Sequence, residues 1–154
     1  MTTRTAVEDF VGQQSFAIVG VSRQPRKFGT YAYKELKKRG YRVFPVNPQA
    51  ETIEGDRCFP SLAALPEPVG GVLIVVPPSQ TEQVVREAAA AGIKRVWMQQ
   101  GAASPQAIQY CEQNGISEVH GECILMFAGS VESVHRFHRF VWKILGKLPK
   151  HEVN

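Results

Sequence analysis

The chain has 154 residues, enough for one domain with its own hydrophobic core. Its composition, 44% hydrophobic and 21% charged residues, is that of a soluble globular protein and argues against extended disorder. No apolar run reaches the length of a membrane span and the N-terminus lacks a signal-peptide core, so we expect a cytoplasmic protein without a membrane partner. The net charge of +4 is modest, and basic and aromatic residues do not alternate as in single-strand binders, so we expect no nucleic-acid partner.

The first part of the chain predicts two helices and a strand. Val7, Phe10 and Val11 fall at helical spacing and predict an amphipathic lead-in helix. An apolar run over residues 16–21 predicts a strand, and a helix is expected over residues 30–39. Its inward-facing side chains are expected to be Tyr31, Tyr33 and Leu36.

Two strands are predicted in the middle of the chain. One covers residues 41–46, and the other covers residues 71–76, which are apolar on both faces as in a central parallel strand. The looser segment between them is expected to hold a short extension near residues 57–59. It also predicts one helical turn over residues 61–65, with Ser61 as its N-cap.

A helix, a strand and a second helix are expected next. Ser79 or Thr81 is expected to cap the first helix, which extends to residue 91. Its inward-facing side chains are expected to be Val84, Val85, Ala88 and Ala91. A strand follows over residues 95–98, and Ser104, with a proline after it, starts a helix that ends near residue 114.

The alternation of strands and helices defines the predicted fold. With a last strand over residues 116–120, it predicts a Rossmann-like, doubly wound α/β domain with a mainly parallel sheet of about five strands. We treat residues 1–154 as a single domain with a core over about residues 12–127.

An added C-terminal helix is expected over about residues 130–146, with Ser130 as its cap. It either packs in a groove of its own sheet or joins two subunits in a homodimer. Its apolar stripe is formed by Val134, Phe137, Val141 and Leu145, and Phe140 and Trp142 lie outside this stripe.

Residues 16–29 carry the clearest functional signal. A buried strand leads there into a glycine turn, a polar loop with three cations and the start of a helix. The turn is Gly20, Val21 and Ser22, and the cations are Arg23, Arg26 and Lys27. Such a turn presents backbone N–H groups to a phosphate. The full dinucleotide fingerprint is absent, however, which leaves an ordinary strand-to-helix turn equally open.

Four predicted strand ends combine small, polar and rigid residues. They are Gly20-Val21-Ser22, Val46-Asn47-Pro48, Val76-Pro77-Pro78 and Gln99-Gln100-Gly101. In a parallel sheet these ends lie at one edge, where ligands bind. None of the four offers an obvious acid, base or nucleophile, so the pattern favours binding over catalysis.

The motifs G-V-S-R-x-P-x-K-x-G, G-Y-x-V-x-P-V-N-P, V-P-P and V-W-M-Q-x-G occur in this order after the predicted strands. With them the chain resembles the single-domain CoA-binding proteins, which are similar to the nucleotide-binding N-terminal domain of the succinyl-CoA synthetase α subunit. The resemblance covers about residues 12–127. It departs at residues 120–123, His-Gly-Glu-Cys, where that family tends to have an Asp-Arg-Cys segment.

The resemblance implies roles for the residues at the strand ends. Gly20 and Ser22 would approach the diphosphate, and Lys27, with Arg23 or Arg26, would supply positive charge. Asn47 and Pro48 would flank the adenosine; Val76, Pro77 and Pro78 would wall the adenine; and Gln100 and Gly101 would lie near the pantetheine arm. Val21 and Val46 belong to the same predicted set of binding residues. CoA also suits the sequence better than NAD, because Asn47 replaces the acidic residue that holds the ribose in NAD sites.

We therefore expect a protein that binds coenzyme A or an acyl-CoA, has no catalytic machinery of its own and serves a regulatory or carrier role. One alternative is a small acyl-CoA transferase or thioesterase that uses Cys123 or Glu122, and another is an NAD(P)-binding redox sensor. The three cysteines have no disulfide or metal spacing, and we expect them to be reduced. The spacings of His120 with Cys123 and of His135 with His138 do not suffice for a metal site.

Overall fold

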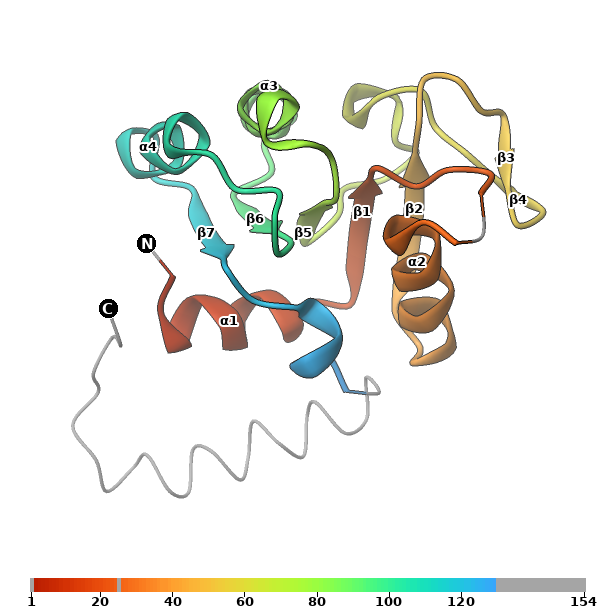
Figure 1. Ribbon diagram of the computed structural model, residues 1–154, viewed down its shortest axis with the longest axis horizontal. Helices are drawn as coiled ribbons and strands as arrows, with labels where there is room; N and C mark the ends of the chain where they lie inside the picture. Colours follow the sequence, from red (N-terminus) through yellow and green to blue (C-terminus); the bar gives the residue numbers. More distant parts are fainter. Residues whose placement is uncertain (1, 25, 130–154) are drawn as a thin grey trace.

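The computed structural model describes residues 2–24 and 26–129 (Figure 1). Its main sheet has the strand order β2-β1-β5-β6-β7, and every neighbouring pair is parallel. The strands are β1 (Ser15–Val19), β2 (Arg42–Val46), β5 (Gly71–Ile74), β6 (Arg95–Met98) and β7 (Ser117–His120). The predicted Rossmann-like α/β fold with a parallel sheet of five strands is thereby confirmed.

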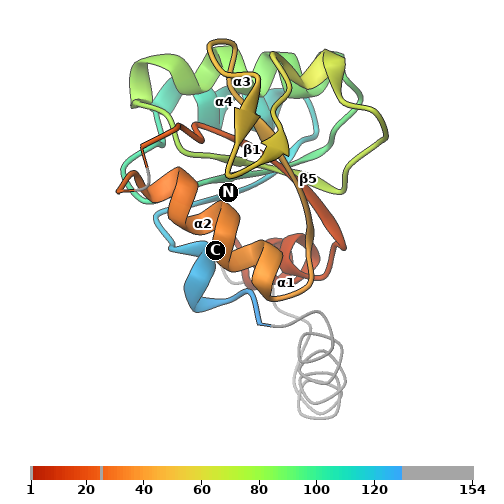
Figure 2. The ribbon, with the colours of Figure 1, turned by 90° about the vertical axis from the view of Figure 1, so that its right-hand side faces the viewer.

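Helices cover both faces of the sheet (Figures 1 and 2). One face carries α1 (Arg4–Val11), α2 (Phe28–Lys38) and the 3₁₀ turn η2 (Ile124–Met126). The opposite face carries α3 (Pro78–Ala90), α4 (Pro105–Gln113) and the 3₁₀ turn η1 (Leu62–Ala64). The fold therefore has three layers with a hydrophobic core on each side of the sheet.

Alternation along the strands divides the apolar side chains between the two cores. Phe16 and Ile18 of β1 pack against α1 and α2, whereas Ala17 between them belongs to the core under α3 and α4. In β6, Trp97 faces the α1 side and Met98 the α3 side, and both are fully buried. As predicted for residues 71–76, β5 is apolar on both faces because both faces are covered.

A small antiparallel hairpin follows β2. Its strands β3 (Thr52–Ile53) and β4 (Asp56–Arg57) include part of the extension predicted near residues 57–59. The hairpin is fastened to α2, because the Tyr33 hydroxyl and the Lys37 ammonium both donate to the Asp56 carboxylate. This contact holds the loop after β2 against the helix that follows β1.

Several local predictions were wrong. Tyr31 is 54% exposed and Ala91 is exposed, so neither side chain faces the core as expected. Neither Ser79 nor Thr81 caps α3, which starts at Pro78 because the first helical turn needs no hydrogen bond from a proline nitrogen. The Ser61 side chain makes no capping hydrogen bond to η1.

Other local predictions were confirmed. The hydroxyl of Ser104 accepts a hydrogen bond from the Ala107 N–H at 3.1 Å and caps α4. Val7, Phe10 and Val11 of α1 are buried, as are Tyr33 and Leu36 of α2. Two predicted strand ends, in contrast, were wrong: the strands expected to reach residues 21 and 76 end at Val19 and Ile74.

The predicted C-terminal helix over residues 130–146, with its Ser130 cap and its apolar stripe, lies outside the described residues. None of the helices in the described part of the chain is long and apolar enough to cross a membrane.

Candidate ligand-binding site

The strand order reverses at the centre of the sheet. The chain passes from β1 to β2 on one side and then returns to β5 on the other side of β1. In doubly wound sheets, ligands bind outside the carboxyl ends of the strands at such a reversal. Because the strands are parallel, their exits share one edge of the sheet, as predicted, and the reversal makes the exits of β1 and β5 the centre of the candidate site.

Gly20 directly follows β1, and its backbone packs against the backbone of Val75. Its φ is +114°, and a Cβ placed there would lie 2.2 Å from the carbonyl oxygen of Val75. A Cβ on Gly29, near the start of α2, would lie 2.4 Å from the carbonyl oxygen of Gly20. Only glycine at both positions allows the exit of β1, the exit of β5 and the start of α2 to meet this closely.

Thr30 fixes the loop between Gly20 and α2. Its buried hydroxyl donates to the Ser22 carbonyl at 2.7 Å and accepts from the Ser22 N–H at 3.2 Å. The Ser22 N–H, predicted to approach a diphosphate, therefore already has a partner. Sequence reasoning missed Thr30, whose place in the helical pattern gave no sign of this role.

Asn47 joins the exits of β1 and β2. Its side-chain amide donates to the Val21 carbonyl at 2.8 Å, and its side-chain oxygen accepts from the Gln49 N–H at 2.8 Å. The Asn47 backbone N–H donates to the Phe59 carbonyl at 2.9 Å. The side chain thus orients the loop, and one amide hydrogen and one oxygen lone pair remain for further hydrogen bonds.

The start of α2 combines backbone donors with positive charge. Lys27 occupies the N-cap position, no side chain caps the helix, and its first turn has no acidic residue. Arg26 and Lys27 are exposed, and neither makes a hydrogen bond or ion pair with another described side chain. Arg23 is exposed and donates to the Gln49 carbonyl at 3.0 Å. Such a helix end attracts an anion through its N–H groups and its dipole.

Two buried polar side chains connect the exits of β5, β6 and β7. The Thr81 hydroxyl donates to the Ala102 carbonyl at 2.5 Å, which joins α3 to the loop after β6. The side-chain oxygen of Gln99 accepts from the Ile124 N–H at 3.1 Å. Neither role was predicted: Thr81 was expected only as a helix cap, and nothing in the sequence distinguishes the buried Gln99 from the exposed Gln100 beside it.

The predicted site residues differ in what they can present to a ligand. The side chains of Val21 and Val46 are buried, which leaves only their backbone for contacts. Pro48, Pro77, Pro78 and Gly101 are exposed, and Val76 is half-buried. The exposed Gln100 lies at the exit of β6, one strand beyond β5, and its amide donates to the Gly121 carbonyl at 3.4 Å.

An open hollow of about 520 Å³ lies beside the exit of β2. It is lined by Pro48, Gln49, Ala50, Glu51, Arg57, Cys58 and Pro60. Of these residues only Pro48 was predicted as part of the site. The hairpin supplies Arg57, whose guanidinium lies 5.0 Å from the centre of the Phe59 ring. Burial raises the pKa of the Cys58 thiol, so this side chain is a neutral part of the wall.

The candidate reactive residues lie toward β7. The Glu122 carbonyl accepts a hydrogen bond from the Trp97 indole at 3.1 Å, and Cys123 is half-buried. Nδ1 of His120 lies 2.7 Å from the buried carboxylate of Glu118.

Two further candidates were a redox-active Cys111 and a metal site. Burial raises the pKa of Cys111, on α4, to about 12, so its thiol remains protonated at neutral pH. No group of three or more His, Cys, Asp or Glu side chains in the described ranges could hold a metal ion. His135 and His138 lie outside these ranges.

A reversal in a parallel sheet, a glycine turn and an uncapped helix start with cations together define a nucleotide-binding α/β domain. Comparison with known families is more specific, since the model for the CoA-binding domain matches residues 14–128. The chain belongs to this CoA-binding domain family, and the recognition made from its strand-end motifs is confirmed.

Relatives of known sequence or structure agree with this assignment. The chain is 33% identical over 88 residues to the α subunit of ADP-forming acetate–CoA ligase II from Pyrococcus furiosus; the match covers 56% of this chain and 19% of that protein. A conserved hypothetical protein from the same species has a similar structure, with a TM-score of 0.71, 39% identity and coverage of 73% of this chain and 97% of that one. A hypothetical protein from Pyrococcus horikoshii OT3 has a TM-score of 0.73 at 28% identity, covering 79% of this chain and 87% of that one.

Proposed function

We propose that this protein binds coenzyme A or an acyl-CoA, has no catalytic machinery of its own and serves as a regulatory or carrier protein. The observation that carries the proposal is the junction of β1, β5 and α2, where glycine backbones meet beside an uncapped, positively charged helix start. The similarity to an acetate–CoA ligase subunit supports the choice of ligand. The matched part spans less than a fifth of that subunit's length, so its ligase activity is not transferred to this chain.

The diphosphate is assigned to the start of α2. The first N–H groups of this helix donate to no capping side chain, and Arg26 and Lys27 are available to balance the phosphate charge. The adenosine is assigned to the exits of β2 and β5, the strands on either side of β1, where Pro48 and Pro77 offer rigid exposed surfaces. The pantetheine arm would then extend toward Gln100 at the exit of β6.

CoA is favoured over a nicotinamide dinucleotide by the end of β2. An NAD site commonly has a carboxylate there, which binds the ribose hydroxyls. In this protein the position is held by Asn47, whose amide is bound to the Val21 carbonyl. The extra ribose phosphate of CoA is instead compatible with the excess of cations around the site, and it would be repelled by a carboxylate at this position.

Thermal shift measurements with CoA, acetyl-CoA, NADH and NADPH in parallel test the choice of ligand. A ligand present at one hundred times its dissociation constant stabilises the folded protein by about 2.7 kcal/mol. We expect CoA and acetyl-CoA to raise the melting temperature and the two dinucleotides to leave it unchanged. Equal stabilisation by NADPH would contradict the proposal and support the redox-sensor alternative.

A matched pair of lysine substitutions locates the site. We expect Lys27→Gln to weaken CoA binding by roughly two- to fivefold, because one exposed charge contact contributes up to about 1 kcal/mol. Lys38→Gln makes the same charge change at the other end of α2, where Lys38 is exposed, and is expected to leave the affinity unchanged within about twofold. Calorimetric titration at constant ionic strength measures both effects.

The enzymatic alternative is tested by turnover. A thioesterase or transferase would release free CoA thiol from acetyl-CoA, which a thiol reagent detects. Binding without catalysis is supported by the small, apolar and amide side chains at the strand ends, and we expect no release above the rate without protein. Release that disappears in Cys123→Ala or Glu122→Gln would overturn this part of the proposal while leaving CoA binding intact.

A further inference from the structure

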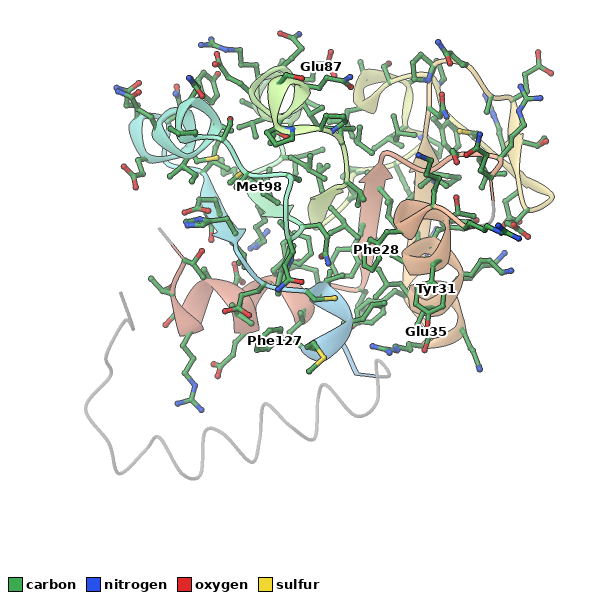
Figure 3. All side chains as sticks on the ribbon, in the orientation of Figure 1. Phe28, Tyr31, Glu35, Glu87, Met98 and Phe127 are labelled. Atoms are coloured by element: carbon green, nitrogen blue, oxygen red, sulfur yellow. The ribbon has the colours of Figure 1, made fainter. Side chains whose placement is uncertain are left out.

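Exposed large hydrophobic side chains gather on a single face of the protein. In the described part of the chain they are Tyr31 of α2, Met126 of η2 and Phe127 after it, with exposed fractions of 54%, 80% and 42%. All three belong to the face that carries α1, α2 and η2 (Figure 3). Figure 3 shows Tyr31 and Phe127 on this side and Glu87 of α3 on the opposite side.

One row of residues along α2 connects these side chains into a surface. Phe28, Tyr31, Glu35 and Arg39 follow one another at helical spacing. The Phe28 and Tyr31 rings lie 6.5 Å apart, and Glu35 pairs with Arg39 at 3.1 Å. The Arg39 guanidinium donates in turn to the carbonyls of Leu125 and Ala128, on either side of Met126 and Phe127. This row of α2 therefore lies next to η2. We call the aromatic and methionine side chains of the two elements the α2–η2 surface; they are Phe28, Tyr31, Met126 and Phe127.

The composition of this surface is that of a protein interface. Tyrosine, phenylalanine and methionine are enriched at the centres of interfaces, whereas such side chains are seldom left together in water. Phe127 is also held in place from below, because its ring lies 6.0 Å from the buried indole of Trp97. The surface is thus built on the core and does not result from a loosely attached turn.

The sequence that follows supplies a complementary segment. The described part ends at Gly129, three residues after Met126, and the next residues carry the apolar stripe of Val134, Phe137, Val141 and Leu145. Phe140 and Trp142 flank this stripe at helical spacing, so the apolar side of the sequence pattern is broader than the stripe alone. In the described residues the three exposed large hydrophobic side chains give one chain a single surface for this broad apolar pattern.

We propose that the α2–η2 surface binds residues 130–146 of a second copy of this chain, which makes the protein a homodimer. A twofold arrangement places each segment against the α2–η2 surface of the partner. Both exposed apolar sets are buried in this way with one repeated contact. Phe28, the first residue of α2, borders the candidate CoA site, whereas the exposed side chains Tyr31, Met126 and Phe127 lie beyond the helix start.

The mass of the full chain in solution is the first test. Sedimentation velocity at micromolar concentration is expected to give twice the chain mass of 17.1 kDa. If the measured mass remained that of one chain at protein concentrations up to roughly 100 μM, any self-association would be too weak to support the proposal, and the proposal would be overturned.

Two substitutions then test the contact from both sides. Met126→Glu on the surface and Phe137→Glu in the stripe are each expected to raise the dimer dissociation constant by roughly 30-fold or more, as for the loss of an interface anchor. The controls Gln109→Glu, exposed on α4, and Lys143→Gln, opposite the stripe in the sequence pattern, change the charge by the same amount and are expected to change the dissociation constant less than about threefold.

Circular dichroism and the thermal shift with CoA show whether each variant is folded. If Met126→Glu does not fold, Phe137→Glu decides, because residue 137 lies outside residues 14–128, which match the CoA-binding domain. The proposed contact would be refuted if a control variant raised the dimer dissociation constant as much as the variant with which it is paired. It would also be refuted if Phe137→Glu left the dimer dissociation constant unchanged. None of these outcomes depends on whether CoA is the ligand, so the dimer and the proposed function stand or fall separately.

Discussion

The two faces of the sheet are alike in their interior and different at their surface. Each has a continuous hydrophobic core packed against two α-helices. All three exposed large hydrophobic side chains of the described residues belong to the face with α1, α2 and η2, which we call the open face. The face with α3 and α4 has none among the described residues, and we call it the closed face. Stability of the fold therefore does not explain the open face, because the closed face shows that the same sheet can be covered completely.

Because the exposed apolar side chains are on one face only, α2 contributes both to the candidate site and to the open face. Its start borders the candidate site at the reversal between β1 and β5, and its row from Phe28 to Arg39 forms part of the open face. No helix on the closed face combines these positions: α3 starts at the exit of β5 but carries Arg86, Glu82 and Glu87 on its outer side. A residue on α2 can thus be tested for ligand binding or for assembly according to where it lies on the helix.

The largest effects are expected from the centre of the two cores. Trp97→Ala is expected to lower the free energy of unfolding by about 3–5 kcal/mol, and Met98→Ala, on the next position of β6, by about 2–5 kcal/mol. Both side chains are fully buried and face opposite sides of the sheet. Urea unfolding followed by circular dichroism measures both values.

Only the Trp97 substitution should also affect the open face. Trp97 packs against Phe127 and donates to the Glu122 carbonyl just before η2, so its loss should loosen η2 and weaken the dimer. Trp97→Phe retains an aromatic ring without the hydrogen bond, and we expect an intermediate effect. If Met98→Ala weakened the dimer as strongly as Trp97→Ala, the two faces would not be independent and the comparison would fail.

Most of the fold follows from patterns in the sequence. The apolar runs of β1, β5 and β6 and the helical spacing of Val7, Phe10 and Val11 were sufficient, because burial on both faces of a parallel sheet requires them. The failures fall at helix starts and helix sides. Tyr31 was expected inside because it is aromatic, but its exposure depends on what covers α2, and helical spacing cannot show that.

The candidate site was predictable in its location and less so in its contacts. Strand-end motifs place Gly20, Asn47 and Pro77 at one edge, as the parallel topology requires. That Asn47 binds the Val21 carbonyl, or that Thr30 holds Ser22, depends on the packing of loops from different parts of the chain. Such contacts leave no periodic trace in a single sequence, and the hollow beside Arg57 was missed for the same reason.

The next largest effect is expected at Gly20, where the chain turns toward the open face. Gly20→Ala should lower the free energy of unfolding by more than Gly92→Ala, although both glycines have a positive φ. At Gly92, beyond α3 on the closed face, a Cβ meets nothing within 4 Å, so only backbone strain of about 1–2 kcal/mol is expected. At Gly20 the Cβ overlaps the Val75 carbonyl, which adds about 1–3 kcal/mol.

The same pair of variants connects stability with binding. Gly20→Ala is expected to weaken CoA binding because the exits of β1 and β5 must separate, whereas Gly92→Ala is expected to leave binding unchanged. Equilibrium unfolding and calorimetric titration of both variants provide the comparison. Equal losses of stability at the two positions would show that the close approach to Val75 is relieved without cost.

The smallest effect concerns the hairpin that α2 carries at its side. The hydrogen bond from Lys37 lowers the pKa of Asp56 below its ordinary value of 3.8, and the hydrogen bond from Tyr33 lowers it further. A carboxyl whose pKa is lower in the folded state stabilises the fold above the unfolded pKa, and this contribution is lost as the pH falls through the folded pKa. Lys37→Gln should therefore raise the pKa of Asp56 and reduce stability at pH 7 more than at pH 2.

The magnitude should stay below about 1 kcal/mol, because Lys37 and Asp56 are 54% and 36% exposed and solvent screens their interaction. NMR titration of the Asp56 carboxyl measures the shift directly, and urea unfolding at the two pH values measures its contribution to stability. Lys38→Gln is the matched control, since it removes the same charge from the next position of α2 without a contact to Asp56. If both variants moved the Asp56 pKa equally, the general field of the basic helix end would account for the shift, and the hydrogen bond from Lys37 would not be needed to explain how the hairpin is held.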